Sequence, residues 1–323
     1  MRSLVLEALR RLTLAESPRR APNPGDAVLK VTHCSVCRTD AKAWLMGHRD
    51  LSLPRVLGHE IAGVREGSGD RFVAWPGKAC GTCPDCCDGH ENRCPRMSIL
   101  GFHRDGGFAE YVSVPESALI PIPPSLPGHL ACLAEPLACT LNALEAAGMS
   151  SGKSVLVFGA GAVGLMMAMA ARAMGAVAFL SERDSEKYAR SAEFRSAVGV
   201  RTHSGSSAPK LDISVNAAPS LDAFSEGLNA LKPGGCFCHF SAFVDDSPVP
   251  LACVNDIHYR ELRVAGAYGC TRRQMGDALR LLDKHRDQAE LLIEETIALE
   301  RVPDVMSAIL AGQTLKFVVD FQA

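Results

Sequence analysis

Four closely spaced cysteines place the strongest constraint on what this chain can fold into. Cys80, Cys83, Cys86 and Cys94 are separated by two, two and seven residues, so their sulfurs can converge on one tetrahedral ion. Four sulfur ligands leave no open position, which favours a structural zinc site over a catalytic one. Cys87 could take the place of Cys86, but only Cys86 gives the even spacing. A disulfide pair or unbonded core cysteines are the alternatives, and such tight spacing disfavours both.

Length and composition describe an ordinary globular protein. The 323 residues are enough for two domains, and 47% are hydrophobic and 22% charged. The net charge of -2 and the absence of a basic stripe argue against a nucleic-acid-binding zinc module, the non-enzymatic alternative. Thirteen cysteines without an evident export signal predict a reducing compartment, and hence a cytoplasmic protein.

Three glycines interrupt the most apolar stretch of the chain. Residues 155–180 carry a single charge and approach the length of a membrane span, but Gly159, Gly161 and Gly164 break the stretch, so we expect no membrane partner. A strand at 154–158, this glycine turn and a helix at 165–174 form a dinucleotide-binding fingerprint. The turn lets a pyrophosphate approach backbone N–H groups at the helix N-terminus.

An acidic residue follows the fingerprint at the expected spacing. A second strand, 176–180, leads to Glu182, whose carboxylate would accept hydrogen bonds from both ribose hydroxyls and would repel a 2′-phosphate, which favours NAD over NADP. The neighbouring Arg183 could instead contact such a phosphate. Together with Val163 and the glycines, these residues form the predicted cofactor site; the alternative is that Glu182 and Arg183 mark a solvated strand end.

A second set of potential metal ligands is spread along the first half of the chain. Cys37, His59, Glu60 and Glu135 offer sulfur, imidazole and carboxylate donors, a mixture that suits a catalytic zinc with a position free for substrate. Taken alone, the set is a weak signal. An isolated His-Glu pair is more often a surface feature, and an isolated buried cysteine more often packs in a core.

The remaining pattern predicts a β-rich lobe followed by alternating strands and helices. A strand at 27–31 belongs to the lobe, and a helix is predicted over 131–147. The later elements follow in α/β alternation: strands at 212–216, 236–240, 261–266 and 315–321, and helices at 221–231, 272–284 and 302–311.

These residues together resemble the zinc-containing medium-chain alcohol dehydrogenases, in particular their sorbitol and threonine dehydrogenase branch. The similar segments cover essentially the whole chain: residues 37–40, 58–60, 80–94, 105–111, 135–137, 159–164, 233–235 and the tail at Lys316. The resemblance implies an α/β protein with two domains. A GroES-like β-barrel catalytic domain would comprise 1–136 and 268–323 with a structural zinc lobe at 78–97, and a Rossmann doubly wound parallel sheet would comprise 137–267.

The resemblance also implies roles for individual residues. Cys37 and His59 would hold the catalytic zinc, Glu60 would ligate or approach it, and Glu135 stands at the third protein ligand. Zinc would lower the pKa of an alcohol, and hydride would pass to nicotinamide. Thr39 would carry the proton, since a hydroxyl can donate and accept at once; its alternative role is to cap the helix after Cys37.

Two cationic positions are implied to lie against the cofactor pyrophosphate, Arg38 and Lys316. One departure from the family lies nearby, because Lys42 occupies the position where many relatives have a relay histidine. An ammonium with a pKa of about 10.4 cannot accept a proton at neutral pH unless burial lowers that pKa. The relay would then end in solvent or use another group such as His48, or Lys42 would serve another purpose. A second departure is a shortened hairpin at 63–75, which predicts a trimmed barrel edge with no ligand lost.

The predicted function is zinc-dependent hydride transfer between a secondary alcohol, polyol or hydroxy acid and NAD. An NADPH-dependent aldehyde or ketone reductase and a non-catalytic zinc- and nucleotide-binding protein are the alternatives. A small-molecule alcohol or carbonyl compound is the expected partner, within a homodimer or homotetramer built through the Rossmann sheets. Several residues follow motifs that line the substrate site in relatives: Trp44, Met46, His48, Arg49, His103 and Arg104. An ion pair of Arg104 with Asp105 is the alternative there.

Overall fold

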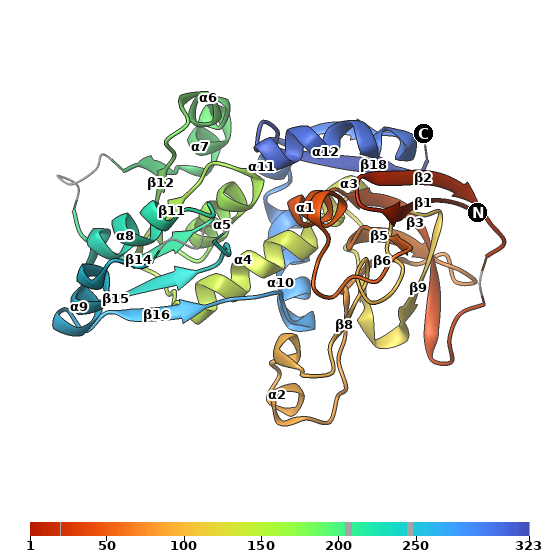
Figure 1. Cartoon of the computed structure of the whole chain (residues 1–323), viewed down its shortest axis with the longest axis horizontal. Coiled ribbons are helices and arrows are strands. Elements are labelled where there is room, and N and C mark those ends of the chain that lie inside the picture. Colours follow the sequence, from red (N-terminus) through yellow and green to blue (C-terminus); the bar gives the residue numbers. More distant parts are fainter. Residues whose placement is uncertain (20, 204–208, 244–247, 323) are drawn as a thin grey trace. The chain divides into compact units, whose positions relative to one another are not determined.

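The chain divides into two compact units (Figure 1). The computed structural model describes residues 1–19, 21–203, 209–243 and 248–322. One unit comprises Met1–Ala138 and Cys270–Ala323, and the other comprises Cys139–Gly269. The sequence analysis expected the chain to pass from one domain to the other after residue 136 and to return at residue 268, and the contacts divide the chain after Ala138 and after Gly269.

The discontinuous unit is built on mainly antiparallel β-sheet, in which only the β17–β18 pair of the described strands is parallel. Among its described residues one sheet runs in the order β10-β6-β5-β3-β18-β17, with β9 also pairing with β3, and a smaller sheet runs β2-β1-β4. The long strand β3 is therefore the centre of the barrel-like lobe. Its strands are β1 (Arg2–Ala8), β2 (Arg11–Glu16), β3 (Asp26–Ser35), β4 (Arg55–Val56), β5 (Glu60–Arg65), β6 (Arg71–Ala74), β9 (Tyr111–Pro115), β10 (Leu119–Pro121), β17 (Ile293–Ile297) and β18 (Lys316–Asp320).

Helices surround this lobe, and several begin at the residues that the pattern indicated. Helix α10 begins with a capping box in which Thr271 accepts from the backbone N–H of Gln274, and it ends at Lys284 as predicted. Outside the four-cysteine segment, the described α-helices of the unit are α1 (Arg38–Met46), α3 (Gly128–Ala131), α4 (Ala134–Ala146, which continues into the second unit), α10 (Arg272–Lys284), α11 (Arg286–Glu290) and α12 (Val302–Ala311).

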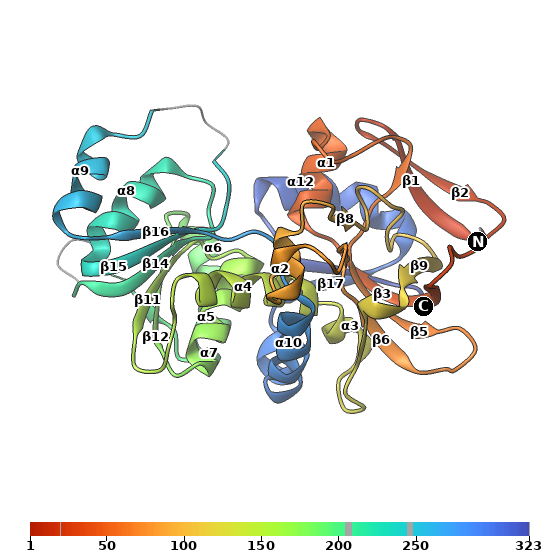
Figure 2. The same cartoon turned by 90° about the horizontal axis from the view of Figure 1, so that it is seen from below.

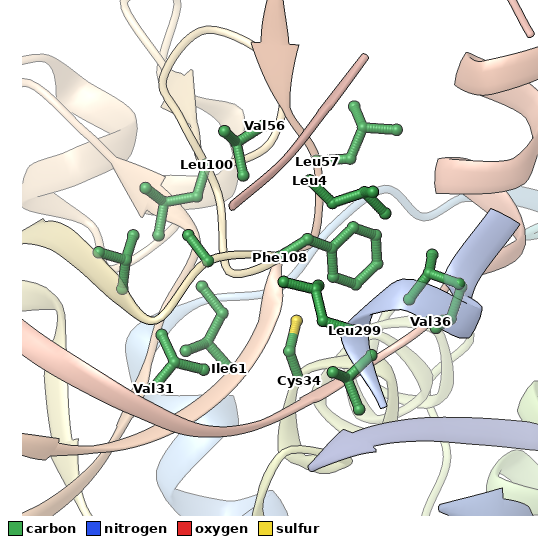
Figure 3. Close-up of a cluster of buried hydrophobic side chains, with 14 of the residues drawn as sticks. Leu4, Val31, Cys34, Val36, Val56, Leu57, Ile61, Leu100, Phe108 and Leu299 are labelled. Atoms are coloured by element: carbon green, nitrogen blue, oxygen red, sulfur yellow. The ribbon is translucent and has the colours of Figure 1, made fainter. Parts of the chain in front are cut away.

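The core of the lobe packs around Phe108 (Figure 3). Phe108, Leu57 and Leu4 are fully buried and come from segments far apart in the sequence. Gly58 lies against this core with a φ of +91°, and a Cβ atom there would lie only 2.8 Å from the Phe108 ring. Only glycine fits this backbone path, and the path fixes the direction in which the next residue, His59, leaves the core.

The four-cysteine segment leaves the lobe as a separate excursion (Figure 1). It is held at its base by the antiparallel pair β7 (Gly77–Lys78) and β8 (Ser98–Ile99). Between them lie the short helix α2 (Pro84–Cys87) and the 3-10 turn η1 (Glu91–Arg93), neither of which contains a buried residue. A segment with so little apolar burial needs another source of stability, such as a bound metal.

The second unit is a parallel α/β sheet. Its described strands are ordered β13-β12-β11-β14-β15-β16, and all neighbouring pairs are parallel. In chain order this is the 3-2-1-4-5-6 arrangement of dinucleotide-binding sheets. The strands are β11 (Ser154–Phe158), β12 (Val177–Ser181), β13 (Arg201–Thr202), β14 (Leu211–Asn216), β15 (Leu231–His239) and β16 (Arg263–Gly266).

Helices cover both faces of this sheet. Figure 2 shows α5 (Ala162–Ala173) and α7 (Ala192–Val198) on one face and α8 (Leu221–Ala230) and α9 (Leu251–Tyr259) on the other, and α6 (Ser185–Arg190) precedes α7. The predicted fold class, a GroES-like lobe with a Rossmann sheet, is confirmed. No helix in the described ranges is long and apolar enough to cross a membrane.

Candidate active site and nucleotide site

Three predicted ligands meet at one point of the first unit. Donor atoms of Cys37, His59 and Glu60 all lie within 4.8 Å of one another. His59 and Glu60 are buried, and Cys37 is partly buried. A sulfur, an imidazole nitrogen and a carboxylate oxygen that close together match the donor set of a zinc site with one position left for substrate.

Local sequence fixes the direction of each of these side chains. Cys37 is the N-cap of α1, and its Sγ accepts from the Thr39 backbone N–H at 3.4 Å. Gly58 directs His59 as described above, and Glu60 is the first residue of β5. The three candidate ligands therefore lie at the start of a helix and at the start of a strand, on a packed scaffold.

Asp40 contacts the backbone or side chain around two of these candidate ligands, although the sequence analysis gave it no role. Its carboxylate is fully buried and accepts from the backbone N–H groups of Cys37 at 3.0 Å and Gly58 at 3.2 Å. The Nδ1 atom of His59 lies 3.3 Å from Asp40 Oδ1. A carboxylate placed this way orients a metal-ligating histidine. The available signal was its position three residues after the N-cap, where an acid completes a capping box.

Glu60 has a second partner, the ammonium of Lys316. The Nζ atom lies 2.5 and 2.6 Å from the two carboxylate oxygens, and the side chains are 5% and 0% exposed. Both residues begin strands that flank β3, which explains how positions so far apart in sequence meet. Burial raises the pKa of Glu60 to about 7. Burial is also the largest influence on Lys316 and lowers its pKa, but the hydrogen bond and charge of Glu60 together with the charges of Cys37 and Glu135 leave that pKa raised.

Glu135 belongs to a different local group. It lies in the first turn of α4, is buried, and has its carboxylate within 4.8 Å of Cys270 Sγ. Its charge acts on both Glu60 and Lys316, so it lies near the same site. The structure thus places Glu60 in the Cys37–His59 group, and a ligand role of Glu135 stays a prediction.

Three further side chains of α1 lie around Cys37. The Thr39 hydroxyl is 3.4 Å from Cys37 Sγ, which suits a group that must exchange a proton near the metal position. Burial, together with the charge of Arg38, lowers the pKa of Lys42. The Arg38 guanidinium donates to the Leu310 carbonyl at 3.0 Å. The pyrophosphate contacts predicted for Arg38 and Lys316 stay predictions.

The cysteine excursion gathers the predicted four sulfurs. Cys80, Cys83, Cys86 and Cys94 have all their sulfurs within 4.8 Å of one another, whereas Cys87 is exposed and is not a member of this group. The backbone N–H of Thr82 is the largest influence on Cys80 and lowers its pKa to about 5. Burial, followed by the hydrogen bond with Cys83, raises the pKa of Cys86 to about 12. Four crowded thiols of this kind fit a bound zinc, which would hold all four as thiolates.

The glycine turn of the second unit has the geometry that a dinucleotide requires. Gly159 has a φ of +111°, and Gly161 is the N-cap of α5. A Cβ atom at Gly164 would lie 2.0 Å from the Gly159 carbonyl oxygen, so this glycine allows the close packing of helix and strand. At Gly161 a Cβ atom would have no heavy atom of the described residues within 4 Å, which leaves room for a phosphate at the helix N-terminus. Val163 lies in the first turn of that helix.

Glu182 stands at the carboxyl end of β12 beside this turn. Its Oε2 accepts from the Ala160 N–H at 2.8 Å, and its Oε1 accepts from the N–H groups of Arg183 and Asp184. Glu182 and Arg183 line a small cavity together with Phe158 and Gly159. The acid therefore lies where a ribose would follow a pyrophosphate bound at the turn.

The residues proposed to line a substrate site are only partly brought together. Met46, His48 and Arg49 line a depression of about 490 Å³ in the first unit. The ring centroids of His48 and His59 lie 4.7 and 5.6 Å from that of Phe102, so both imidazoles contact the same aromatic side chain. Arg104 donates to the Ser113 carbonyl, and Asp105 pairs with Arg55.

Comparison with known proteins finds similarity to zinc-type alcohol and polyol dehydrogenases. Residues 23–124 match the alcohol dehydrogenase GroES-like domain. The L-galactonate-5-dehydrogenase of Escherichia coli (strain K12) is 32% identical over 298 residues, which cover 85% of this chain and 86% of the relative. The D-altritol 5-dehydrogenase of Agrobacterium fabrum is 29% identical over 312 residues, with 90% and 91% coverage. The structure of a zinc-binding dehydrogenase from Sinorhizobium meliloti bound to NADP has a TM-score of 0.88 at 28% identity, covering 99% of this chain and 98% of that one.

The chain therefore belongs to the zinc-type medium-chain alcohol and polyol dehydrogenase family. It is an oxidoreductase of alcohols that uses zinc and a nicotinamide cofactor. The residues present fit these groups, because the mixed donor set and the four-sulfur set can each bind zinc and the open glycine turn admits a pyrophosphate.

Proposed function

We propose that this enzyme oxidises a secondary hydroxyl group of a polyol or sugar acid and uses NAD as the hydride acceptor. The observation that carries the proposal is the cluster of Cys37, His59 and Glu60 next to the Thr39 hydroxyl. It supports the proposal because a zinc ion held by these three side chains would lie next to a hydroxyl that can carry a proton. This arrangement is what an alcohol must meet to lose a proton and a hydride.

Zinc bound there supplies a Lewis acid that makes the substrate hydroxyl more acidic, and nicotinamide supplies the hydride acceptor. The chain's own residues do the remaining work. Thr39 accepts the hydroxyl proton and passes it on, because its oxygen can accept one hydrogen bond while donating another. Asp40 keeps the imidazole of His59 oriented, and Lys316 holds the Glu60 carboxylate when Glu60 is not a metal ligand.

The preference for NAD follows from Glu182. Its carboxylate sits beside the glycine turn, where it accepts a ribose 2′-hydroxyl but repels a 2′-phosphate. The NADP in the Sinorhizobium meliloti structure is the observation that makes this preference worth testing. The substrate class is inferred from two relatives, which are named for L-galactonate and for D-altritol.

A coupled test covers substrate and cofactor together. The purified chain is offered polyols, sugar acids and simple secondary alcohols with NAD or NADP, and reduced nucleotide is measured by its ultraviolet absorbance. We expect NAD-linked turnover of a polyol or sugar acid, reduced in Glu182→Ala through a raised KM for NAD. Turnover with NADP alone, or reduction of aldehydes by NADPH without oxidation of any alcohol, would overturn the proposal.

We also infer that two copies of the chain pair through the edge of the Rossmann sheet. Strand β16 ends the sheet order, and its Val264 side is exposed. Helix α9, which packs on α8, exposes Leu251 and Tyr259 at 72% and 79%. An unpaired strand edge beside exposed apolar side chains favours a symmetric partner that presents the same surface. Sedimentation of the wild type and of a Val264→Lys variant tests this, with a wild-type monomer as the contrary result.

A further inference from the structure

One arginine beside the nucleotide site is already engaged by two neighbours. The Nη1 atom of Arg183 donates to Asp222 Oδ2 at 2.7 Å, and its Nη2 atom donates to Ser220 Oγ at 2.8 Å. Both partners lie where β14 passes into α8, so they approach from the neighbouring βα unit of the sheet. Arg183 itself directly follows Glu182.

The two residues that bind Arg183, Ser220 and Asp222, lie at the start of α8, where such side chains usually cap a helix or interact with its dipole. Ser220 is the N-cap of α8, yet its side chain makes no capping hydrogen bond within the described part of that helix. The hydroxyl accepts from Arg183 instead. Asp222 lies in the first turn of α8, where the helix dipole already favours a negative charge. The hydrogen bond with Asp222 is the largest influence on Arg183 and raises its pKa.

The charges around this cavity then favour a ribose without a phosphate. Glu182, Arg183, Ser220 and Glu226 all line it. With the Arg183 charge paired to Asp222, the two glutamates dominate the local field. A 2′-phosphate carries about two negative charges at neutral pH and would need a free guanidinium to bind it in a bidentate way.

We propose that Asp222 and Ser220 act as specificity-determining residues, by holding the Arg183 guanidinium away from the position of a 2′-phosphate. The idea rests on the proposed use of NAD and adds a second reason for it. Glu182 repels the phosphate directly, whereas the clamp formed by Asp222 and Ser220 withholds the cation that could bind it. Freed from Asp222, the same arginine becomes a phosphate ligand.

The test measures nucleotide binding without catalysis. Isothermal titration of the full-length chain with 5′-AMP and with 2′,5′-ADP gives the ratio of their dissociation constants. In Asp222→Ala we expect binding of 2′,5′-ADP to improve relative to 5′-AMP by about three- to tenfold, the upper range of an exposed charge pair between the freed guanidinium and the 2′-phosphate. Ser220→Ala should shift the ratio in the same direction by less.

Two further variants identify the cause. The double variant Arg183→Ala/Asp222→Ala should return the ratio to its wild-type value, because the gain depends on the arginine. Asp304→Ala removes a carboxylate from an exposed position in α12 of the other unit and should leave the ratio unchanged. Thermal melting of each variant shows that it is folded.

An unchanged ratio in folded Asp222→Ala and Ser220→Ala overturns the clamp, and so does a gain that persists without Arg183 or appears equally in Asp304→Ala. A wild-type chain that binds 2′,5′-ADP more tightly than 5′-AMP overturns the preference for NAD itself. The two failures are therefore distinguishable, since the first concerns the variants and the second the unmodified protein.

Discussion

Replacing Asp40 by asparagine should loosen the catalytic metal site without emptying the cysteine site. The substitution keeps the size of the side chain but turns one acceptor oxygen into a donor NH₂ group. Asp40 accepts from two backbone N–H groups and lies 3.3 Å from His59 Nδ1. In Asp40→Asn one of those buried donors faces another donor.

The magnitude follows from that lost acceptor. An unsatisfied buried donor costs about 1–3 kcal/mol, and loss of a carboxylate behind a metal-ligating histidine typically weakens metal affinity about 10- to 100-fold. An energy of about 1–3 kcal/mol corresponds to a factor of about 5 to 150 in a binding constant, which overlaps with the second range. We therefore expect the affinity of the catalytic site for zinc to be about 10- to 100-fold lower in Asp40→Asn. The cysteine excursion contains no contact with Asp40 among the hydrogen bonds of the described residues and should retain its ion.

Zinc competition against a chelator series, followed by metal analysis, measures this directly. The wild type and the control Asp304→Asn, which changes an exposed carboxylate, should release two zinc ions per chain in two steps. Asp40→Asn should release the first ion at about tenfold or more lower chelator strength and the second as in the wild type. If both ions of Asp40→Asn are released as in the wild type, Asp40 does not position the ligands and this reasoning is wrong.

Three other predictions use matched pairs or single sites. Cys94→Ser should lose one zinc per chain by metal analysis and Cys87→Ser none, because only Cys94 belongs to the four-sulfur group. Gly164→Ala should lower the melting temperature, because the added Cβ atom would clash with the Gly159 carbonyl oxygen. Gly161→Ala should melt as the wild type but bind 5′-AMP and NAD more weakly, because its Cβ atom would meet no described residue and would instead occupy the space left for a phosphate. Phe108→Ala should lose about 3–5 kcal/mol of unfolding free energy in denaturant melts, because this buried ring fills the lobe core.

Each of these has a clear contrary result. Loss of one zinc from Cys87→Ser, or retention of both zinc ions in Cys94→Ser, would contradict the assignment of the four sulfurs. A destabilised Gly161→Ala would show that the space before α5 is not free for a phosphate. A loss below about 1 kcal/mol in Phe108→Ala would mean that the lobe collapses around the cavity.

The parts that were predictable from the sequence are those with local signals. The glycine turn is flanked by β11 and α5 as expected, and helices α10 and α12 have the predicted bounds. Helix α9 was missed because its apolar residues occupy both its packed and its exposed sides, so they form no amphipathic pattern: Cys253 and Ile257 pack against the core, whereas Leu251 and Val254 are exposed. The four sulfurs were predictable because their ligand spacing is contained within one short segment.

The non-local features of the site could not be predicted in the same way. Contact between Lys316 and Glu60 depends on β18 and β5 both flanking β3, which no spacing in the chain reveals. The grouping of Glu60 rather than Glu135 with Cys37 and His59 likewise depends on how strands and helices pack. The engagement of Arg183 by Asp222 and Ser220 joins two neighbouring βα units of the sheet.

Zinc content and NAD-linked turnover, measured on the same preparations of the wild type and His59→Ala, test the central claim most directly. The wild type should hold two zinc ions per chain and oxidise a polyol or sugar acid, and His59→Ala should hold one ion and show no turnover. A His59→Ala protein that keeps both ions, or that turns over as the wild type does, would contradict the placement of a catalytic metal at Cys37, His59 and Glu60.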